Sequence, residues 1–183
     1  MARLNRIAIT LAASAALMQS SVGSAHASGS PSLAADSAQE MIVQLRVSHS
    51  GKCLDIDRAK LDNGVKAQQW TCNGTIAQQW RAVPVDNSSF ELRSVASGKC
   101  LEVENSGTRE GAKVQQWNCS GGKQMRWRTV LVDFESDLFE LRPTHTEGRC
   151  LDIIKGSKDD GATAQSWSCN QTPAQLWQIQ PVK

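Results

Sequence analysis

The chain has 183 residues and a formal net charge of +2 at pH 7, and 40% of its residues are hydrophobic. This length suits one domain with short appendages. The small net charge gives no electrostatic case for a nucleic-acid partner, because phosphate binding requires clustered basic residues. Lysine and arginine are scattered among acids, so no basic arm for a membrane surface is present either.

Residues 1–27 have the pattern of a secretory signal peptide. Arg3 and Arg6 form a basic start, and Ile7–Met18 is a mostly apolar run that is too short to span a bilayer. Ala25-His26-Ala27 offers a small-x-small cleavage site. The alternative, a membrane-anchored N-terminus, fits this length and these flanks less well. We expect a secreted, extracellular protein with no membrane insertion, in which residues 28–40 form a flexible lead-in.

From about residue 41 the chain consists of three copies of one unit. At matched offsets the copies share a cysteine, an acid, a glycine, a Gln-x-Trp, a second cysteine and a second tryptophan. These residues are Cys53, Asp55, Gly64, Gln68, Trp70, Cys72 and Trp80; Cys100, Glu102, Gly111, Gln115, Trp117, Cys119 and Trp127; and Cys150, Asp152, Gly161, Gln165, Trp167, Cys169 and Trp177. Repeats near 41–85, 86–133 and 134–183 therefore form one domain over 41–183.

The signals within a unit are those of short strands. In the first unit, Ile42–Val47 and Ala67–Cys72 alternate apolar and polar residues, and Cys53–Ile56 does so over fewer positions. Arg81–Val85 begins a fourth strand, and Asn63-Gly64 is a turn dipeptide. No stretch has the apolar recurrence of a helix. The sequence predicts an all-β fold of about twelve strands.

Three copies are too few for a blade-type propeller. One unit cannot bury a face alone, so the copies must share a core. Three four-stranded units around a pseudo-threefold axis are the natural closure. The second tryptophan of each unit, at Trp80, Trp127 and Trp177, would meet in that core.

Six cysteines in an exported chain predict disulfides. They allow fifteen pairings, and the simplest joins the two cysteines of each copy. The pairs would be Cys53–Cys72, Cys100–Cys119 and Cys150–Cys169. Each would close a loop of about 20 residues and contribute about 3 kcal/mol to stability. Zinc is disfavoured because neither a C-x-x-C nor a nearby histidine pair occurs, and we expect no metal and no cofactor.

The first unit also predicts a polar pocket. Gln68, Trp70 and Cys72 share one face of a strand, and Cys53 and Asp55 share a face of its partner. A disulfide between these strands would bring the carboxylate close to the amide and the indole. This combination suits a sugar, because a carboxylate accepts hydrogen bonds from hydroxyls and an indole packs on a C–H face.

These features also have structural interpretations. A repeated Gln-x-Trp can be framework, with the glutamine bonded to backbone and the tryptophan in the core. We favour that interpretation for the second tryptophan of each unit, and sugar contact for Trp70, Trp117 and Trp167. An aspartate after a cysteine can also simply cap a turn.

The Cys-Leu-Asp-Ile opening, the Gln-x-Trp-x-Cys and the closing Gln-x-Trp resemble the ricin B-type lectin domains. These domains are β-trefoils, found also as carbohydrate-binding modules of secreted actinobacterial glycosidases. The resemblance covers the chain from about residue 41. It implies a shallow sugar site in each unit for galactose-like sugars or xylan-type chains, and a carbohydrate as the partner.

The first and third units keep the residues that the resemblance assigns to sugar binding. They are Asp55, Gln68, Trp70, Asn73 and Gln78, and Asp152, Gln165, Trp167, Asn170 and Gln175. Both units depart from the family just before the final glutamine, where Ala77 and Ala174 replace a frequent asparagine. That change removes a hydrogen bond to the ligand or the carboxylate and weakens the implication of galactose.

The second unit departs further. Glu102 replaces the aspartate, Met125 the final glutamine and Ser120 the asparagine. We expect this unit to keep the fold and its disulfide but to bind sugar weakly or not at all.

A monomeric, non-enzymatic lectin is the function that these observations favour. The histidines beyond the signal, His49 and His145, lie at the turns before a first cysteine, and no nucleophile or zinc motif occurs. In the family that the chain resembles, hydrolysis belongs to an attached domain. The alternative is a protein-interaction β-trefoil, such as a toxin's cell-binding subunit or a protease inhibitor, which fold alone does not exclude.

Overall fold

The computed structural model describes residues 41–182, so the predicted signal peptide and lead-in lie outside the described residues. The predicted all-β fold of about twelve strands is confirmed. The strands are β1 (Met41–Val47), β2 (Cys53–Ile56), β3 (Ala67–Trp70), β4 (Trp80–Pro84), β5 (Phe90–Ser94), β6 (Cys100–Val103), β7 (Ala112–Trp117), β8 (Arg126–Asp133), β9 (Leu138–Pro143), β10 (Arg149–Ile153), β11 (Ala164–Ser168) and β12 (Trp177–Pro181).

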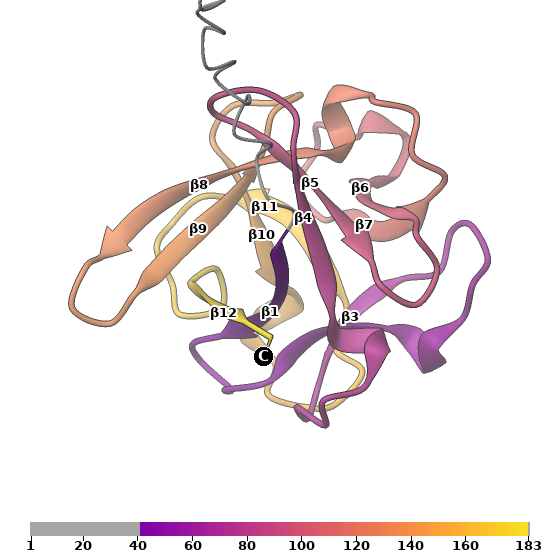
Figure 1. The fold of residues 1–183 in the computed structure, drawn as a ribbon. Coiled ribbons are helices and arrows are strands. Elements are labelled where there is room, and N and C mark those ends of the chain that lie inside the picture. The colour runs from indigo at the N-terminus through magenta and orange to yellow at the C-terminus, as the bar shows by residue number, and fades with distance from the viewer. Residues whose placement is uncertain (1–40, 183) are drawn as a thin grey trace, which may run out of the picture. The chain divides into compact units, whose positions relative to one another are not determined.

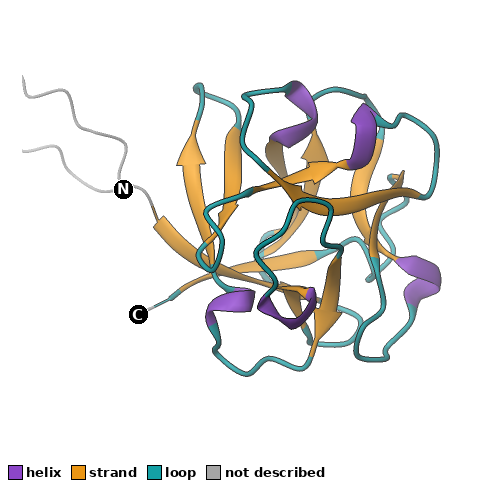
Figure 2. Ribbon diagram, turned by 90° about the vertical axis from the view of Figure 1, so that its right-hand side faces the viewer, coloured by secondary structure: helices purple, strands orange, loops and turns teal. Residues whose placement is uncertain are grey.

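Within residues 41–182 the helical elements are five single 3₁₀ turns, drawn as short purple ribbons in Figure 2. They are η1 (Asp57–Ala59), η2 (Ile76–Gln78), η3 (Glu104–Ser106), η4 (Lys123–Met125) and η5 (Ile154–Gly156). None of the helices within residues 41–182 has the length and apolar character needed to cross a membrane.

Six strands form a closed barrel. β1 pairs with β4, β4 with β5, β5 with β8, β8 with β9, β9 with β12, and β12 returns to β1, always antiparallel. The remaining strands form three hairpins, β2–β3, β6–β7 and β10–β11. Each repeat thus supplies two barrel strands and one hairpin, which is the predicted β-trefoil (Figure 1).

The apolar alternation of the sequence explains the barrel interior. In β1, Val43, Leu45 and Val47 are buried while their neighbours are partly or fully exposed. Successive strand residues point to opposite faces, so one set fills the barrel. Between β2 and β3, Gly64 adopts a φ of +78°, a conformation that glycine tolerates without strain.

Three tryptophans lie in the common core, as predicted. Trp80, Trp127 and Trp177 are each 0% exposed and belong to one apolar cluster. Trp80 donates its indole N–H to the carbonyl of Leu54 at 3.2 Å. Trp127 and Trp177 make the same bond to the carbonyls of Leu101 and Leu151, at 2.9 and 3.0 Å. Each bond joins the last strand of a repeat to the first strand of its hairpin.

The three predicted disulfides are present. Cys53–Cys72, Cys100–Cys119 and Cys150–Cys169 each join Cα atoms 5.1 Å apart. Each ties the start of a hairpin to the segment that leaves it, and the described residues contain no free cysteine.

Replacement of a tryptophan by phenylalanine should cost more stability in the core than at the surface, because only the core indole donates a buried hydrogen bond. Trp80→Phe should lower the free energy of unfolding by about 2 kcal/mol or more, because it leaves the Leu54 carbonyl without its donor and opens a small void. Trp70→Phe, the same change on a partly exposed ring, should alter stability by about 0.5 kcal/mol or less. Chemical denaturation of both variants measures the difference, and equal costs would contradict the bond's importance.

Candidate sugar-binding sites

Each repeat has one surface pocket beside its hairpin. We name them the repeat 1, repeat 2 and repeat 3 pockets, with volumes of about 380, 230 and 610 Å³. Their shared lining is an acid, a glutamine and a tryptophan at matched positions. These are Asp55, Gln68 and Trp70; Glu102, Gln115 and Trp117; and Asp152, Gln165 and Trp167.

The acid and the glutamine form the floor of each pocket. Asp55 and Gln68 are register partners across β2 and β3, and Gln68 Nε2 donates to Asp55 Oδ1 at 3.0 Å. Gln165 donates to Asp152 in the same way at 2.7 Å. Both aspartates are at most 6% exposed. The carboxylate and the amide therefore lie together, and the hydrogen bond from the amide fixes the direction of the carboxylate.

The tryptophan of each hairpin forms an exposed wall. Trp70, Trp117 and Trp167 are 40%, 42% and 36% exposed, in contrast to the fully buried core tryptophans. Each exposed ring lies beside the acid and the glutamine of its own pocket. The repeated exposure agrees with the interpretation of these three rings as contact surfaces.

Gln78 and Gln175 occupy a different place from the one that the sequence suggested. Both were expected to form a polar edge of the pocket, but both are 0% exposed. Gln78 accepts from the Asn73 backbone N–H at 2.9 Å and donates to the Thr71 carbonyl at 3.1 Å. These backbone bonds hold the side chain beneath the loop, out of reach of a ligand.

In repeat 3 the buried glutamine also supports the floor. Gln175 Nε2 donates to Asp152 Oδ2 at 3.1 Å, while Gln165 binds Oδ1. Its oxygen accepts from the Asn170 backbone N–H at 2.9 Å. Gln175 is therefore a positioning residue behind the carboxylate.

Asn73 and Asn170 stand at the pocket rims and shape the loop there. Asn73 Oδ1 accepts from the backbone and hydroxyl of Thr75, at 3.0 and 2.8 Å. Asn170 makes the same pair of bonds with Thr172. Because the oxygens are used in the turn, the amide Nδ2 is the group that each asparagine offers to a ligand.

The repeat 2 pocket has the same floor pair but a different surround. Gln115 donates to Glu102 at 3.0 Å. Met125 replaces the buried glutamine, and its sulfur accepts from the Ser120 backbone N–H at 3.4 Å and from the Ser120 hydroxyl at 3.6 Å. Gln124, at the position of Ala77 and Ala174, lines the pocket with its longer side chain. These substitutions account for a smaller pocket with no second amide behind the acid.

A turn of a neighbouring repeat packs against each pocket tryptophan. The turn glycine of repeat 3, Gly161, lies against Trp70, and Gln68 pairs through backbone with Thr163. The same contacts recur around the axis, with Gly64 against Trp117 and Gly111 against Trp167. Their Cβ positions would lie 3.6 to 3.8 Å from the indoles, and their positive φ angles favour glycine.

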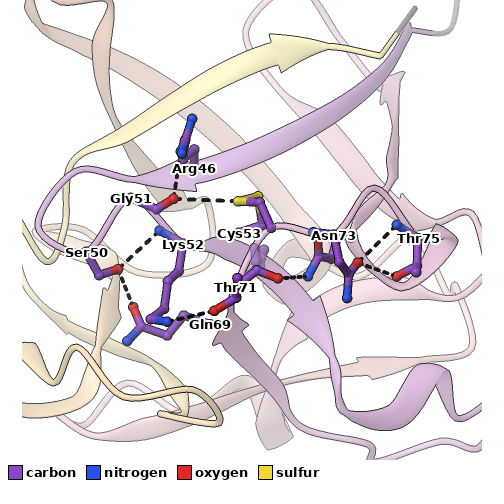
Figure 3. Close-up of a disulfide and its surroundings, with 12 residues drawn as sticks. Arg46, Ser50, Gly51, Lys52, Cys53, Gln69, Thr71, Asn73 and Thr75 are labelled. Atoms are coloured by element: carbon purple, nitrogen blue, oxygen red, sulfur yellow. Dashed lines mark hydrogen bonds between the residues drawn. A yellow bond between two sulfur atoms is a disulfide. The ribbon is translucent and has the colours of Figure 1, made fainter.

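Polar side chains hold these turns in place. In repeat 1, Gln69 Nε2 donates to the carbonyls of Ser157 and Asp159 in repeat 3, at 2.7 and 2.9 Å. Ser50 in turn donates to Gln69 Oε1 at 2.8 Å, beside the disulfide shown in Figure 3. Lys52 reaches Asp160 at 2.7 Å.

Repeat 3 replaces this amide bridge with a guanidinium. Ser166 stands where repeat 1 has Gln69, and its hydroxyl is buried without a partner. Arg149 instead donates to the Thr108 carbonyl of repeat 2, at 3.1 and 3.2 Å, and pairs with Glu110 at 3.2 Å. The sequence analysis missed all of these contacts between repeats.

His49 is a further pocket residue that the sequence analysis did not assign. It belongs to repeat 1 but lines the repeat 3 pocket. Its Nε2 lies 2.7 Å from the Ser157 carbonyl, so this nitrogen is the donor, and Nδ1 is buried without a partner. A comparison of the loops before the three first cysteines would have marked it, because a histidine occurs in repeats 1 and 3, at His49 and His145, whereas repeat 2 has Ala96.

Burial sets the acidity of the two aspartates. Desolvation raises the pKa of the Asp55 carboxyl above its usual value of 3.8, against the lowering effect of the Gln68 hydrogen bond. Desolvation likewise raises the pKa of Asp152, although Gln165, Gln175 and the nearby His49 favour its charged form.

Two clusters have atoms close enough for a metal ion, but their chemistry does not suit one. Each combines an acid with the two cysteines of one repeat: Glu91 with Cys100 and Cys119, and Glu140 with Cys150 and Cys169. These sulfurs are bonded to each other, so neither is a thiolate ligand. The acids are paired with Arg93 and Arg142.

Comparisons with solved structures agree with this architecture. The designed threefold-symmetric protein ThreeFoil is 34% identical, with a TM-score of 0.73 over 77% of this chain and 99% of its own. An exo-β-1,3-galactanase from Clostridium thermocellum is 29% identical, with a TM-score of 0.74 over 79% of this chain and 31% of the enzyme. A ricin B-like lectin of Macrolepiota procera in complex with lactose shares the fold, at 19% identity and a TM-score of 0.64, over 76% of this chain and 94% of the lectin.

Sequence comparison with curated proteins gives no match. The family model of the ricin-type beta-trefoil lectin domain-like proteins matches residues 33–117, 83–161 and 123–183. These segments overlap and together reach from residue 33 to the C-terminus, so the chain belongs to the ricin-type β-trefoil lectin domain-like family.

Proposed function

We propose that the protein is a secreted, non-enzymatic lectin that binds carbohydrate in the repeat 1 and repeat 3 pockets. The observation that carries the proposal is a buried carboxylate, aimed by a glutamine, beneath an exposed indole. This arrangement occurs twice with the same residue types, at Asp55, Gln68 and Trp70 and at Asp152, Gln165 and Trp167.

The pocket chemistry matches the two faces of a sugar ring. One carboxylate can accept hydrogen bonds from two adjacent hydroxyls, and the asparagine amide at the rim adds a donor. The indole offers an apolar surface for the C–H face of the ring. Two such sites on one rigid domain favour a polymer or a glycosylated surface, because the second contact becomes intramolecular.

A galactose-like sugar or a xylan-type chain is the ligand class that we propose. The lactose complex of the Macrolepiota lectin and the galactanase that shares this domain support galactose. Ala77 and Ala174 weaken that choice, because neither can donate a hydrogen bond at the position where the family often has asparagine. We propose that the repeat 2 pocket binds weakly or not at all, because Met125 cannot support Glu102 as Gln175 supports Asp152.

We also propose that the protein is exported and that it has no catalytic activity. Three disulfides are typical of proteins in oxidising, extracellular compartments. His49 and His145 both bond backbone carbonyls, which is a structural use of the ring. The pocket aspartates are held by amides as hydrogen-bond acceptors, an arrangement suited to binding.

Removal of the two floor carboxylates should weaken sugar binding strongly. Asp55→Ala combined with Asp152→Ala should weaken affinity for galactose or xylan fragments by about tenfold to a hundredfold, because charge-assisted hydrogen bonds are lost. Retention on immobilised galactose and on xylan measures the effect. Glu102→Ala removes a carboxylate from repeat 2 and serves as the matched control, with retention expected to persist. Unchanged retention of the double variant would refute the site assignment.

Acid should weaken sugar binding first, because protonation of Asp55 and Asp152 does not destabilise the fold. Because burial raises the pKa of Asp55 and Asp152, both protonate at a pH above 3.8 and stop accepting hydrogen bonds from hydroxyls. The folded state then holds these protons more tightly than the unfolded state, so their protonation stabilises the fold as pH falls. Parallel titrations of sugar affinity and thermal stability test this order. An affinity midpoint at or below 3.8 would contradict it.

A further inference from the structure

We propose that the repeat 3 pocket selects a sugar residue that carries an acidic substituent, whereas the repeat 1 pocket takes a neutral one. This inference rests on the proposed lectin function and assigns different ligands to its two sites. The difference arises in the loop after the first hairpin strand of each repeat, where the two pockets differ in charge.

The repeat 1 pocket carries balanced charges. Asp55, Asp57, Arg58 and Lys66 line it, two acids and two bases. Arg58 Nε lies 4.0 Å from Asp57 Oδ1, so a counter-charge stands beside the guanidinium. Lys66 donates to the Gly161 carbonyl at 3.2 Å. An anionic ligand gains little here, because its attraction to the bases is offset by the acids.

The repeat 3 pocket lacks that counter-charge. Lys155 matches Arg58 in position and backbone conformation, with a φ of 55° against 56°. Ile154 replaces the acid Asp57, and Lys158 is the second base of this pocket, as Lys66 is in repeat 1. One buried acid, Asp152, therefore faces two exposed lysines.

The acids near these lysines already have partners. Asp159 bonds the Ser157 hydroxyl at 3.2 Å, and Asp160 is held by Lys52 at 2.7 Å. Among residues 41–182 no acid forms an ion pair with Lys155 or Lys158. Two ammonium groups at the rim of a pocket are thus open to an anionic ligand.

The carboxylate on the floor does not cancel this attraction. Asp152 is 6% exposed, and Gln165 and Gln175 each bond one of its oxygens. It can accept from ring hydroxyls while the lysines at the rim contact an anionic group elsewhere on the same sugar. The pocket also has room for the substituent, since its volume is about 610 Å³ against about 380 Å³ in repeat 1.

His49 is a further difference between the repeat 3 and repeat 1 pockets, and His145 of repeat 3 also has a buried Nδ1 without a partner. His49 lines the repeat 3 pocket, and its Nδ1 is buried without a partner. A buried polar atom with no partner is costly unless a ligand satisfies it. The matching residue in the loop before the next repeat's first cysteine is Ala96, which offers no such atom.

Matched sugar pairs test the proposal in a protein with one working site. The full mature protein carrying Asp55→Ala is titrated with methyl galactoside, its 6-uronic acid and its 6-sulfate, and with xylotriose and a glucuronic acid-branched xylotriose. The NMR shift of the Trp167 indole N–H reports binding at this pocket. We expect the acidic member of a pair to bind about tenfold more tightly at low ionic strength, a preference that added salt reduces.

Three variants assign the preference to residues. Ile154→Asp restores the arrangement of repeat 1 and should bring the ratio of acidic to neutral affinity close to one. Lys155→Gln with Lys158→Gln should do the same. Lys123→Gln removes an exposed charge outside all three pockets and should leave the ratio unchanged. In the matched Asp152→Ala protein, which keeps only the repeat 1 pocket, the Trp70 signal should show no preference.

The possible results distinguish a failure of the acidic preference from a failure of the repeat 3 sugar site. If neutral and acidic sugars shift Trp167 with equal affinity, the acidic preference is refuted and the lectin function stands. If the preference survives both Ile154→Asp and the double lysine change, these residues do not cause it and the inference fails. If no sugar shifts Trp167, the repeat 3 site and this inference fall together.

Discussion

The hydrogen bond from each core tryptophan to a hairpin carbonyl is the interaction on which both the fold and the pockets depend. Trp80 donates to Leu54, and the next residue along β2 is Asp55. The bond that closes the core therefore also fixes the depth at which the pocket acid lies. Gln78, two residues before Trp80, lies beneath the loop that follows β3. In this arrangement the framework and the binding surface share their backbone.

Repeat 2 shows that the framework persists without the full pocket. Trp127 keeps its indole bond, and the Cys100–Cys119 disulfide is intact. Met125 nevertheless occupies the place of the buried glutamine, where it fills volume and offers only a weak acceptor. The core packing tolerates this exchange because both side chains are long and unbranched. The hydrogen bond to the acid is lost, because methionine has no N–H to donate. Binding function is therefore easier to lose than the fold.

The sequence could predict what recurs within one repeat. Cysteine spacing, strand alternation and the acid–Gln-x-Trp set follow from local periodicity, and they describe the barrel, the disulfides and the pocket floor. The contacts of Gly161 with Trp70 and of His49 with the repeat 3 pocket could not be predicted, because a pattern inside a repeat does not say which neighbour it meets. The burial of Gln78 also depends on loop geometry, which decides whether an amide bonds backbone or faces solvent.

The pairing of β1 with β12 closes the barrel and brings the two ends of the described domain together. Val43 is opposite Pro181, and the Val182 N–H bonds the Ile42 carbonyl at 2.9 Å. A short peptide could join these ends, and the chain could then be opened at the β8–β9 hairpin to give a circular permutant with all three pockets intact. The same adjacency lets the module be inserted into a surface loop of another protein as readily as it can be fused to a terminus.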